Sequence, residues 1–140
     1  MTAAPVVVTG VDFVSVPTTD LEAAMEFYGT VLGLPRSSVY QRGSNAPVGA
    51  EFEAGDLTLS VIVSETLGIE FRPTNVPIAL HVEDIEAARA ELESRGIAFS
   101  ADTLDTGVCF MAFFRDPDGN ALMLHHRYAP RVAEAAPQTG

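Results

Sequence analysis

The chain has 140 residues, 47% of them hydrophobic, so it can bury a sizeable core as one domain or as two small modules. Its formal net charge of −11, from 19 acidic residues against 8 arginines, disfavours nucleic acid and anionic membranes as partners and would suit a cationic ligand. No apolar run approaches the roughly 20 residues of a membrane helix, and the single cysteine excludes an internal disulfide, so a soluble cytoplasmic protein is expected.

The first predicted elements follow an N-terminal arm of residues 1–9. Residues 11–16, VDFVSV, are short and β-branched, which predicts a strand. Asp20 can cap the helix that follows, in which apolar residues recur with a period near 3.6 residues. Gly33 stands where this helix is expected to end. The apolar face comprises Leu21, Ala24, Met25, Tyr28 and Leu32.

Three strands after this helix are expected to complete a first module of residues 10–64. They are predicted near residues 36–42, where the pattern is weaker, and near 47–53 and 57–63. Residues 65–75 form the expected linker to a second module.

The second module, residues 76–128, repeats this order of elements. A strand is predicted over 76–82, and Asp84 can cap a helix whose apolar face includes Ile85, Ala88 and Leu92. Gly96 stands at the expected end of that helix. The remaining strands are predicted near 98–101, 107–114 and 121–127, and the Ala- and Pro-rich tail of residues 129–140 is expected to be loose.

An internal repeat supports the two modules. The segment TDLEAAMEFY from Thr19 aligns with EDIEAARAEL from Glu83 at an offset of 64 residues. The same offset, without a gap, places EFEAGDLTLS on RDPDGNALML and matches Gly55 with Gly119. Because one shift serves both pairs of segments, the sequence predicts two modules of one design.

The segment DPDGN, residues 116–120, has two possible interpretations. Asp116 and Asp118 lie close to His125 and His126 in the sequence, as metal ligands often do. However, Asp and Asn side chains bond to their own backbone, Pro presets φ and Gly accepts positive φ, so the segment can build a hairpin turn without a metal ion. This turn chemistry favours a structural role for the two aspartates.

The segments VDFVSVPTTDLEAAMEFYGTVLGL and FFRDPDGNALML resemble the opening and the closing hairpin of the vicinal oxygen chelate superfamily. This superfamily includes glyoxalase I, extradiol dioxygenases, fosfomycin resistance enzymes and bleomycin-binding resistance proteins. The resemblance spans about residues 10–127. It implies an α+β fold of two tandem βαβββ modules whose curved sheets enclose a cavity, usually in a homodimer.

The resemblance also implies where a divalent metal ion would bind. Enzymes of the superfamily place one ligand seven residues before the helix-starting Asp of each module and another four residues after the turn Gly. Here these positions carry Phe13, Leu59, Pro77 and Met123, none of which is an ordinary ligand for such an ion. A slip of one residue would bring in Asp12, Ser60, Val76 and Leu122 or Leu124, which still make no site. We therefore expect no metal ion and no other cofactor.

Strand alternation predicts which side chains face the cavity. If the four positions above face inward, a hairpin closed by residues 116–119 sets Ala112 opposite Met123 and Phe110 opposite His125. This pairing turns Phe110, Ala112 and Phe114 toward the cavity. A register slip of one residue would replace these three by Cys109, Met111 and Phe113. The predicted ligand-binding set is Phe13, Ser15, Leu59, Pro77, Ala79, His81, Phe110, Ala112, Phe114, Met123 and His125.

Two histidines are the most reactive members of this mostly apolar set. His81 or His125 could hydrogen-bond a ligand, act as a general acid or base, or join a displaced metal site, and each could also be a buried residue without such a role. His126 should face the opposite side of its strand. Cys109 lies in an apolar strand, where a buried, inert thiol is the favoured interpretation.

Three functions fit these features. The favoured hypothesis is a metal-free small-molecule-binding protein that sequesters an apolar, aromatic or cationic ligand. The alternative is a lyase, isomerase or dioxygenase-like enzyme that uses His81 or His125 for acid–base chemistry or as displaced metal ligands. The third is a sensory or structural dimer with a vestigial cavity. The expected partners are a small molecule and a second copy of the chain.

Overall fold

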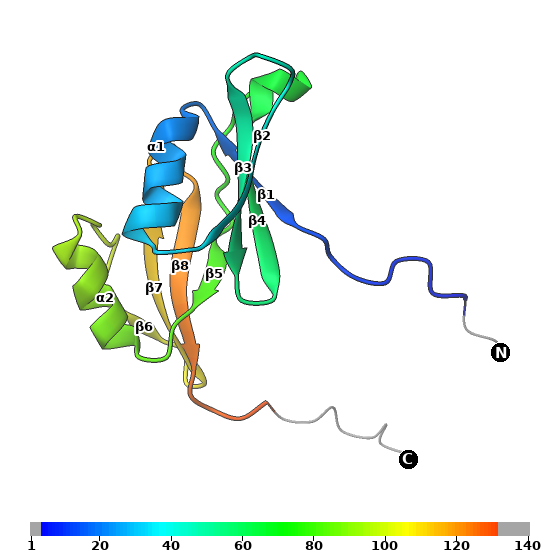
Figure 1. The fold of residues 1–140 in the computed structure, drawn as a ribbon. Helices are drawn as coiled ribbons and strands as arrows, with labels where there is room; N and C mark the ends of the chain where they lie inside the picture. The colour runs from blue at the N-terminus through cyan, green and yellow to red at the C-terminus, as the bar shows by residue number, and fades with distance from the viewer. Residues whose placement is uncertain (1–3, 132–140) are drawn as a thin grey trace. The chain divides into compact units, whose positions relative to one another are not determined.

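The computed structural model describes residues 4–131, so most of the predicted tail lies outside the described residues. The chain divides into two compact units: residues 1–74 together with 116–120, and residues 75–115 together with 121–140. Each unit contains a four-stranded mixed sheet and a helix, and the α+β class is confirmed (Figure 1). Within the described part of the chain, no helix is long and apolar enough to cross a membrane.

The sheet of the first unit has the strand order β1-β4-β3-β2, in which β1 runs parallel to β4 and the other neighbours are antiparallel. A two-residue turn between Ala54 and Leu57 joins β3 to β4, and Gly55 takes a φ of 66° there. The strands are β1 (Val14–Thr18), β2 (Arg36–Gln41), β3 (Pro47–Ala54) and β4 (Leu57–Val63).

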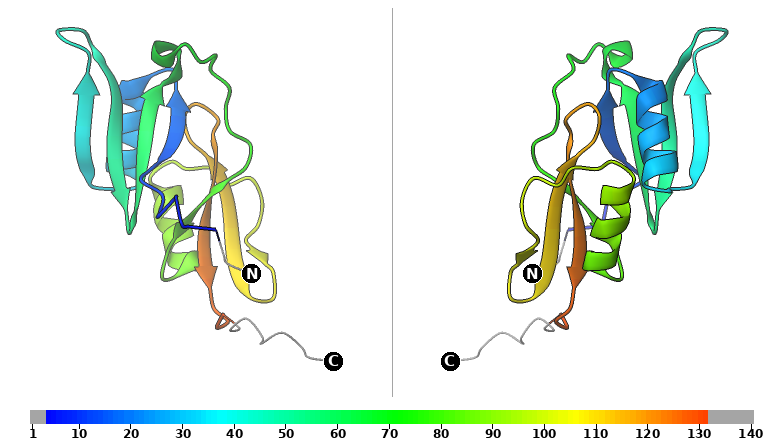
Figure 2. Two further views of the ribbon diagram at one scale, coloured as in Figure 1. Left: turned by 90° about the vertical axis from the view of Figure 1, so that its right-hand side faces the viewer. Right: turned by 90° about the vertical axis from the view of Figure 1, so that its left-hand side faces the viewer.

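The helix of the first unit begins as predicted but does not remain an α-helix. Asp20 caps α1 (Leu21–Met25) by accepting a 3.1 Å hydrogen bond from the backbone N–H of Ala23. The helix then widens into a π-helical segment, η1 (Glu26–Val31), at whose end the N–H of Leu32 bonds to the carbonyl of Phe27. Figure 2 shows this helix lying along one face of the first sheet.

The core of the first unit lies between this helix and strands β3 and β4. The Tyr28 ring packs edge-on against Phe27, with ring centroids 5.0 Å apart, and lies 6.1 Å from the ring of Phe52. Each large apolar side chain that is fully buried contributes about 1.5–3 kcal/mol to folding. The buried apolar residues of this core are Val16, Leu21, Ala24, Phe27, Tyr28, Ala50, Phe52, Leu59 and Val61.

The DPDGN segment belongs to the first unit and forms the expected turn. Oδ1 of Asp116 accepts the backbone N–H groups of Asp118 and Asn120, each at 2.9 Å. The carboxylate of Asp118 accepts hydrogen bonds from the hydroxyls of Thr18 and Thr19 at 2.6 and 2.7 Å. The prediction that Asp116 builds the turn is therefore confirmed, whereas the carboxylate of Asp118 bonds to Thr18 and Thr19 instead of to the turn.

The second unit repeats the design of the first. Its sheet has the order β5-β8-β7-β6, with β5 parallel to β8. Asp84 caps the helix through a 3.0 Å bond from the N–H of Ala87, and Gly96, with a φ of 94°, ends it. The helix packs on β7 and β8. The elements are β5 (Ile78–His81), α2 (Ile85–Ser94), β6 (Leu104–Asp105), β7 (Cys109–Arg115) and β8 (Ala121–Arg127).

The strand predicted at residues 98–101 is wrong. The segment makes a backbone hydrogen bond from Ser100 to the carbonyl of Phe113, but the regular ladder with β7 begins only at Leu104. The ring of Phe99 instead packs against that of Phe114, with 5.2 Å between the ring centroids. The guanidinium carbon of Arg89 lies 4.7 Å from the centroid of the Phe99 ring. Side-chain packing therefore holds this segment without making it a strand.

Candidate functional site

Each sheet has two faces, one against its own helix and one opposite, which we call the helix-distal face. Paired residues on neighbouring strands point to the same side of a sheet, and successive residues alternate. In the first sheet, Leu59 and Val61 are fully buried and mark the helix side. In the second sheet, Leu122 and Leu124 do the same. The helix-distal faces are therefore set by the strand registers.

The helix-distal face of the first sheet is polar. Ser15 pairs with Ser60, which in turn pairs with Glu51, so the three side chains lie on this face. Tyr40 crosses from the edge strand, and its hydroxyl lies 3.1 Å from Oγ of Ser60. The Tyr40 ring fills the space above Gly49, where a Cβ atom would collide with it. The glycine thus permits a tyrosine to cover the middle of the sheet.

Two carboxylates give this face a negative charge. Glu51 and Glu53 lie two residues apart on β3 and so share the helix-distal side. Oε2 of Glu53 accepts a 2.7 Å hydrogen bond from the Thr58 hydroxyl, and its Oε1 accepts one of 2.9 Å from Ser37. Such a face can attract a basic group. Sequence reasoning missed Tyr40, Glu51 and Glu53, although the alternation in AEFEA was a usable signal for the two glutamates.

The expected position of Leu59 is wrong. Leu59 pairs with Val14 on β1 and with Phe52 on β3, and its side chain is fully buried on the helix side. Ser15 and Phe13 alternate with Val14 and fall on the helix-distal face, as expected. The parallel register therefore separates Phe13 from Leu59, and the helix-distal neighbours of Leu59 are the hydroxyl residues Thr58 and Ser60.

The helix-distal face of the second sheet is mainly apolar. Met123 lies in register with Ala79 on one side and with Phe113 on the other, and Met111 pairs with His125. Met111, Phe113 and Met123 are each half-buried rather than buried. Pro77, immediately before β5, alternates with Ile78 and falls on the same face. This surface offers an aromatic ring and two thioethers around the middle of β8.

The expected positions of Phe110, Ala112 and Phe114 are wrong, and the one-residue slip is the register that occurs. Arg115 pairs with Ala121, not with residue 120, so Ala112 and Phe114 face the helix side with Leu124 and Leu122. The cause is a five-residue turn instead of a four-residue one. Asn120 remains in that turn because its backbone and side chain bond to Asp116. Cys109, Met111 and Phe113 take the vacated positions.

The three histidines have different surroundings. His125 is half-buried on the helix-distal face, and its ring makes no hydrogen bond to another residue in the described part of the chain. His81, the last residue of β5, is exposed, and its Nε2 lies 3.0 Å from Oε1 of Glu83. The His126 ring lies 6.2 Å from that of His81, and its Nδ1 is 3.0 Å from the carbonyl oxygen of Val82. His125 is therefore the histidine with open donor and acceptor capacity.

The residues at the expected metal positions do not fit a divalent ion. Phe13, Pro77 and Met123 offer at most one thioether, and the hydroxyls beside Leu59 are weak donors. Residues 4–131 contain no group of three or more His, Cys, Asp or Glu side chains that could hold a metal ion. Metal independence stays a prediction of this donor chemistry.

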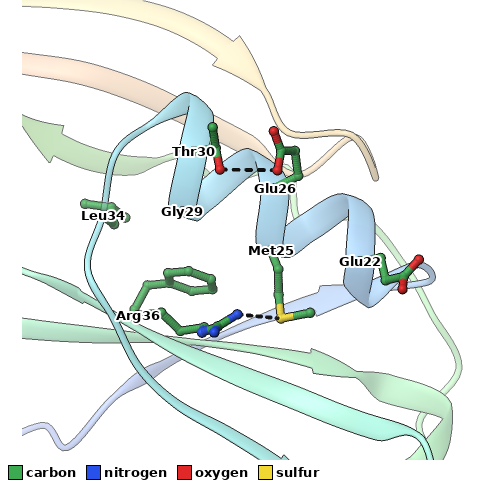
Figure 3. A pocket seen from close by; sticks show the side chains of 8 residues that line it. Glu22, Met25, Glu26, Gly29, Thr30, Leu34 and Arg36 are labelled. Carbon is green, nitrogen blue, oxygen red and sulfur yellow. Dashed lines mark hydrogen bonds between the residues drawn. The ribbon is translucent and has the colours of Figure 1, made fainter.

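A separate groove of about 480 Å³ lies beside α1 in the first unit (Figure 3). In Figure 3 the side chains of Arg36 and Met25 point toward one another, and the guanidinium lies 3.8 Å from the sulfur. The groove offers two carboxylates, a guanidinium and the hydroxyl of Thr30, which donates a 3.2 Å hydrogen bond to Oε2 of Glu26. Its lining is Glu22, Met25, Glu26, Gly29, Thr30, Leu34, Arg36 and Phe52.

Comparisons with known proteins agree with this architecture. The family model of the Glyoxalase/Bleomycin resistance protein/Dioxygenase superfamily matches residues 10–124. A search of curated proteins finds no match. A solved member of the same superfamily from Sphaerobacter thermophilus DSM 20745 superposes with a TM-score of 0.73 at 22% identity, covering 86% of this chain and 98% of that one.

Two further solved structures are similar at slightly higher identity. TnmS3, an antibiotic binding protein from Streptomyces sp. CB03234, has a TM-score of 0.72 at 25% identity. The match covers 88% of this chain and 99% of the TnmS3 chain. A glyoxalase/bleomycin resistance protein/dioxygenase from Nocardioides has a TM-score of 0.68 at 26% identity. The match covers 97% of this chain and 93% of that one.

Proposed function

Because the chain belongs to the Glyoxalase/Bleomycin resistance protein/Dioxygenase superfamily, we propose that it is a small-molecule-binding protein that holds an apolar or aromatic ligand without a metal ion. The proposed site is the helix-distal face of the second sheet. The superfamily contains both binding proteins and enzymes, so the proposal depends on the site chemistry and not on the fold.

The observation that carries this proposal is the half-buried apolar surface formed by Met111, Phe113 and Met123. An aromatic ring and flexible thioethers adapt to a flat apolar ligand, and sulfur–aromatic contacts contribute about 0.3–1.5 kcal/mol each. His125 adds one polar group with open hydrogen-bonding capacity. Ligand sites typically combine such an apolar lining with few polar groups that orient the ligand.

The similarity to TnmS3 supports the class of function. That protein is an antibiotic binding protein, and 99% of its length is covered at 25% identity. An antibiotic-like small molecule is therefore a reasonable ligand class for this chain, and the half-buried ring of Phe113 favours one with an aromatic part. A basic ligand would instead be attracted to Glu51 and Glu53 on the first sheet.

A titration with a neutral aromatic compound tests the proposal. We expect 1-naphthaleneacetamide to bind in isothermal titration calorimetry with equal affinity before and after treatment with a chelator. Met123→Gln should weaken binding by about tenfold, because a polar amide then faces the apolar ligand. Met25→Gln is the matched control, since Met25 is also half-buried but lies in the groove of the first unit. Failure of the compound to bind, or equal effects of both variants, would contradict the proposal.

An enzyme that uses His125 for acid–base chemistry is the second candidate. The open hydrogen-bonding capacity of its ring favours it, whereas Nε2 of His81 is already engaged by Glu83. The two functions predict different fates for a bound ligand. Recovery of the ligand unchanged after prolonged incubation supports binding alone, whereas a product that disappears in His125→Gln supports catalysis.

A further inference from the structure

Arg127, the last residue of β8, has an unsatisfied donor on the proposed binding face. It pairs with Cys109, and alternation places its side chain on the same side as Met123 and His125. Its Nε is buried and has no hydrogen-bond partner among the described residues. Its Nη2 reaches the carbonyl oxygen of Pro130 only at 3.5 Å, the long limit for such a bond.

Other arginines of the chain show how such a donor can be satisfied. Arg72, Arg89 and Arg95 each pair with a glutamate at 3.0–3.5 Å, whereas the guanidinium of Arg36 contacts the sulfur of Met25. A guanidinium carries five N–H donors, and burying one of them without a partner is costly. Arg127 therefore has capacity that the described residues do not use.

His125 supplies a second donor beside it. The two residues lie two positions apart on one strand, which separates their Cα atoms by roughly 7 Å. The ring of His125 likewise has no hydrogen-bond partner in the part of the chain that the structure describes. Two N–H donors at one end of an apolar strand face match a ligand whose aromatic part ends in an anionic group.

We propose that the ligand bound on this face carries a carboxylate, which Arg127 receives and to which His125 donates a second hydrogen bond. Its aromatic part then lies on Phe113 and Met123. The inference rests on the proposed binding function and adds the chemical class of the ligand. A planar guanidinium can hold both oxygens of a carboxylate, which a single amine cannot do.

The net charge of −11 does not oppose this arrangement at short range. Repulsion from distant carboxylates is screened over about 8 Å at physiological ionic strength, whereas direct charge-assisted hydrogen bonds keep most of their strength. The helix-distal faces of the two sheets differ in their polar side chains. The first presents the carboxylates of Glu51 and Glu53, and the second presents the donors of Arg127 and His125.

A pair of nearly isosteric probes tests the inference. We expect 1-naphthaleneacetate to bind at least about tenfold more tightly than neutral 1-naphthaleneacetamide, measured by isothermal titration calorimetry. In Arg127→Gln the carboxylate should lose this advantage, so that the two probes bind with nearly equal affinity. Arg127→Lys should retain part of it. Arg72→Gln, which removes an exposed guanidinium elsewhere, is the control and should change neither affinity.

The outcomes separate this inference from the binding function. If both probes bind wild type equally, or if Arg127→Gln leaves the advantage intact, the carboxylate assignment is overturned and the binding function stands. Tighter binding of 2-(1-naphthyl)ethylammonium than of either probe also overturns it. If no probe binds, both the function and the inference fail. Thermal unfolding of each variant shows whether it is folded. If Arg127→Gln does not fold, the effect of Arg127→Lys on the preference for the carboxylate probe decides the question.

Discussion

The phenolic hydroxyl of Tyr28 donates a 2.6 Å hydrogen bond to Oδ2 of Asp116, and both residues are buried, with exposed fractions of 0% and 6%. Nδ2 of Asn120 donates to the same oxygen at 2.8 Å. The other oxygen accepts the two backbone N–H groups of the turn. The carboxylate therefore has four donors, which is the condition for burying such a group at tolerable cost.

Tyr28→Phe should lower the free energy of unfolding by about 1–3 kcal/mol, because it leaves the buried carboxylate with one donor fewer. Urea denaturation monitored by circular dichroism measures the change. The ring and its contacts with Phe27 and Phe52 are retained, so the loss reports the hydroxyl group and not the packing.

Tyr128→Phe is the control for this substitution. Its hydroxyl donates to Asp105 at 2.8 Å, but that pair is exposed to solvent, so its loss should cost less than about 1 kcal/mol. A cost for Tyr28→Phe no larger than that for Tyr128→Phe would show that the buried bond is not important for stability.

The stability of the protein should fall at alkaline pH because of Tyr28. Burial, and then the negative charge of Asp116, raise the pKa of Tyr28 well above its ordinary value of 10.0. Below pH 10 the group is protonated in both the folded and the unfolded state. Above pH 10 only the unfolded state releases the proton, so the free energy of unfolding should decrease by about 1.4 kcal/mol per pH unit.

Denaturant titrations between about pH 8 and pH 11 measure this slope. Tyr28→Phe lacks the ionisable group and should lose stability less steeply over that range, despite being less stable at neutral pH. Identical slopes in the variant and the wild type would assign the alkaline sensitivity to other groups.

Asn120→Asp should destabilise the protein in a pH-dependent manner. The new carboxylate would replace the amide that bonds to Asp116 and to the carbonyl oxygen of Pro17, each at 2.8 Å. Two carboxylates this close cannot both ionise, so one pKa is raised above its unfolded value. The free energy of unfolding should be lower by about 3 kcal/mol at neutral pH, and the deficit should shrink as the pH falls through that raised pKa.

Asn120→Ala separates the charge from the lost hydrogen bonds. It removes the same amide without adding a carboxylate, so its deficit should stay nearly constant between about pH 4 and pH 8. Parallel pH profiles for the two substitutions, measured by urea denaturation, would contradict the proposed repulsion with Asp116.

Local patterns were sufficient to predict the modules and their helices. Asp20 and Asp84 cap the helices as the repeat indicated, because capping depends only on residues three positions away. The turn at residues 116–120 was likewise predicted from residues that bond to their own neighbours. These features are encoded within a few residues and repeat at a fixed offset.

The strand registers could not be predicted in the same way. Asn120 remains in the turn partly through its bond to Pro17, 103 residues earlier in the chain, and no local pattern reports such a contact. One extra residue in the turn then moves Phe110, Ala112 and Phe114 to the helix side. Leu59 was misplaced for a related reason, since its face depends on the parallel pairing with Val14. The faces of the sheets, and hence the site, depend on these long-range contacts.

Two adjacent phenylalanines test the register directly. Phe114 is 1% exposed and packs against Phe99, so Phe114→Ala should lower the free energy of unfolding by about 3–5 kcal/mol. Phe113 is half-buried on the helix-distal face, and Phe113→Ala should cost less than half as much while weakening the binding of 1-naphthaleneacetamide. Denaturation and calorimetry on the same two variants measure both effects. The register first expected from the sequence requires the reverse pattern, with Phe113→Ala the more destabilising substitution and Phe114→Ala the one that impairs binding, because a shift of one residue exchanges the two faces.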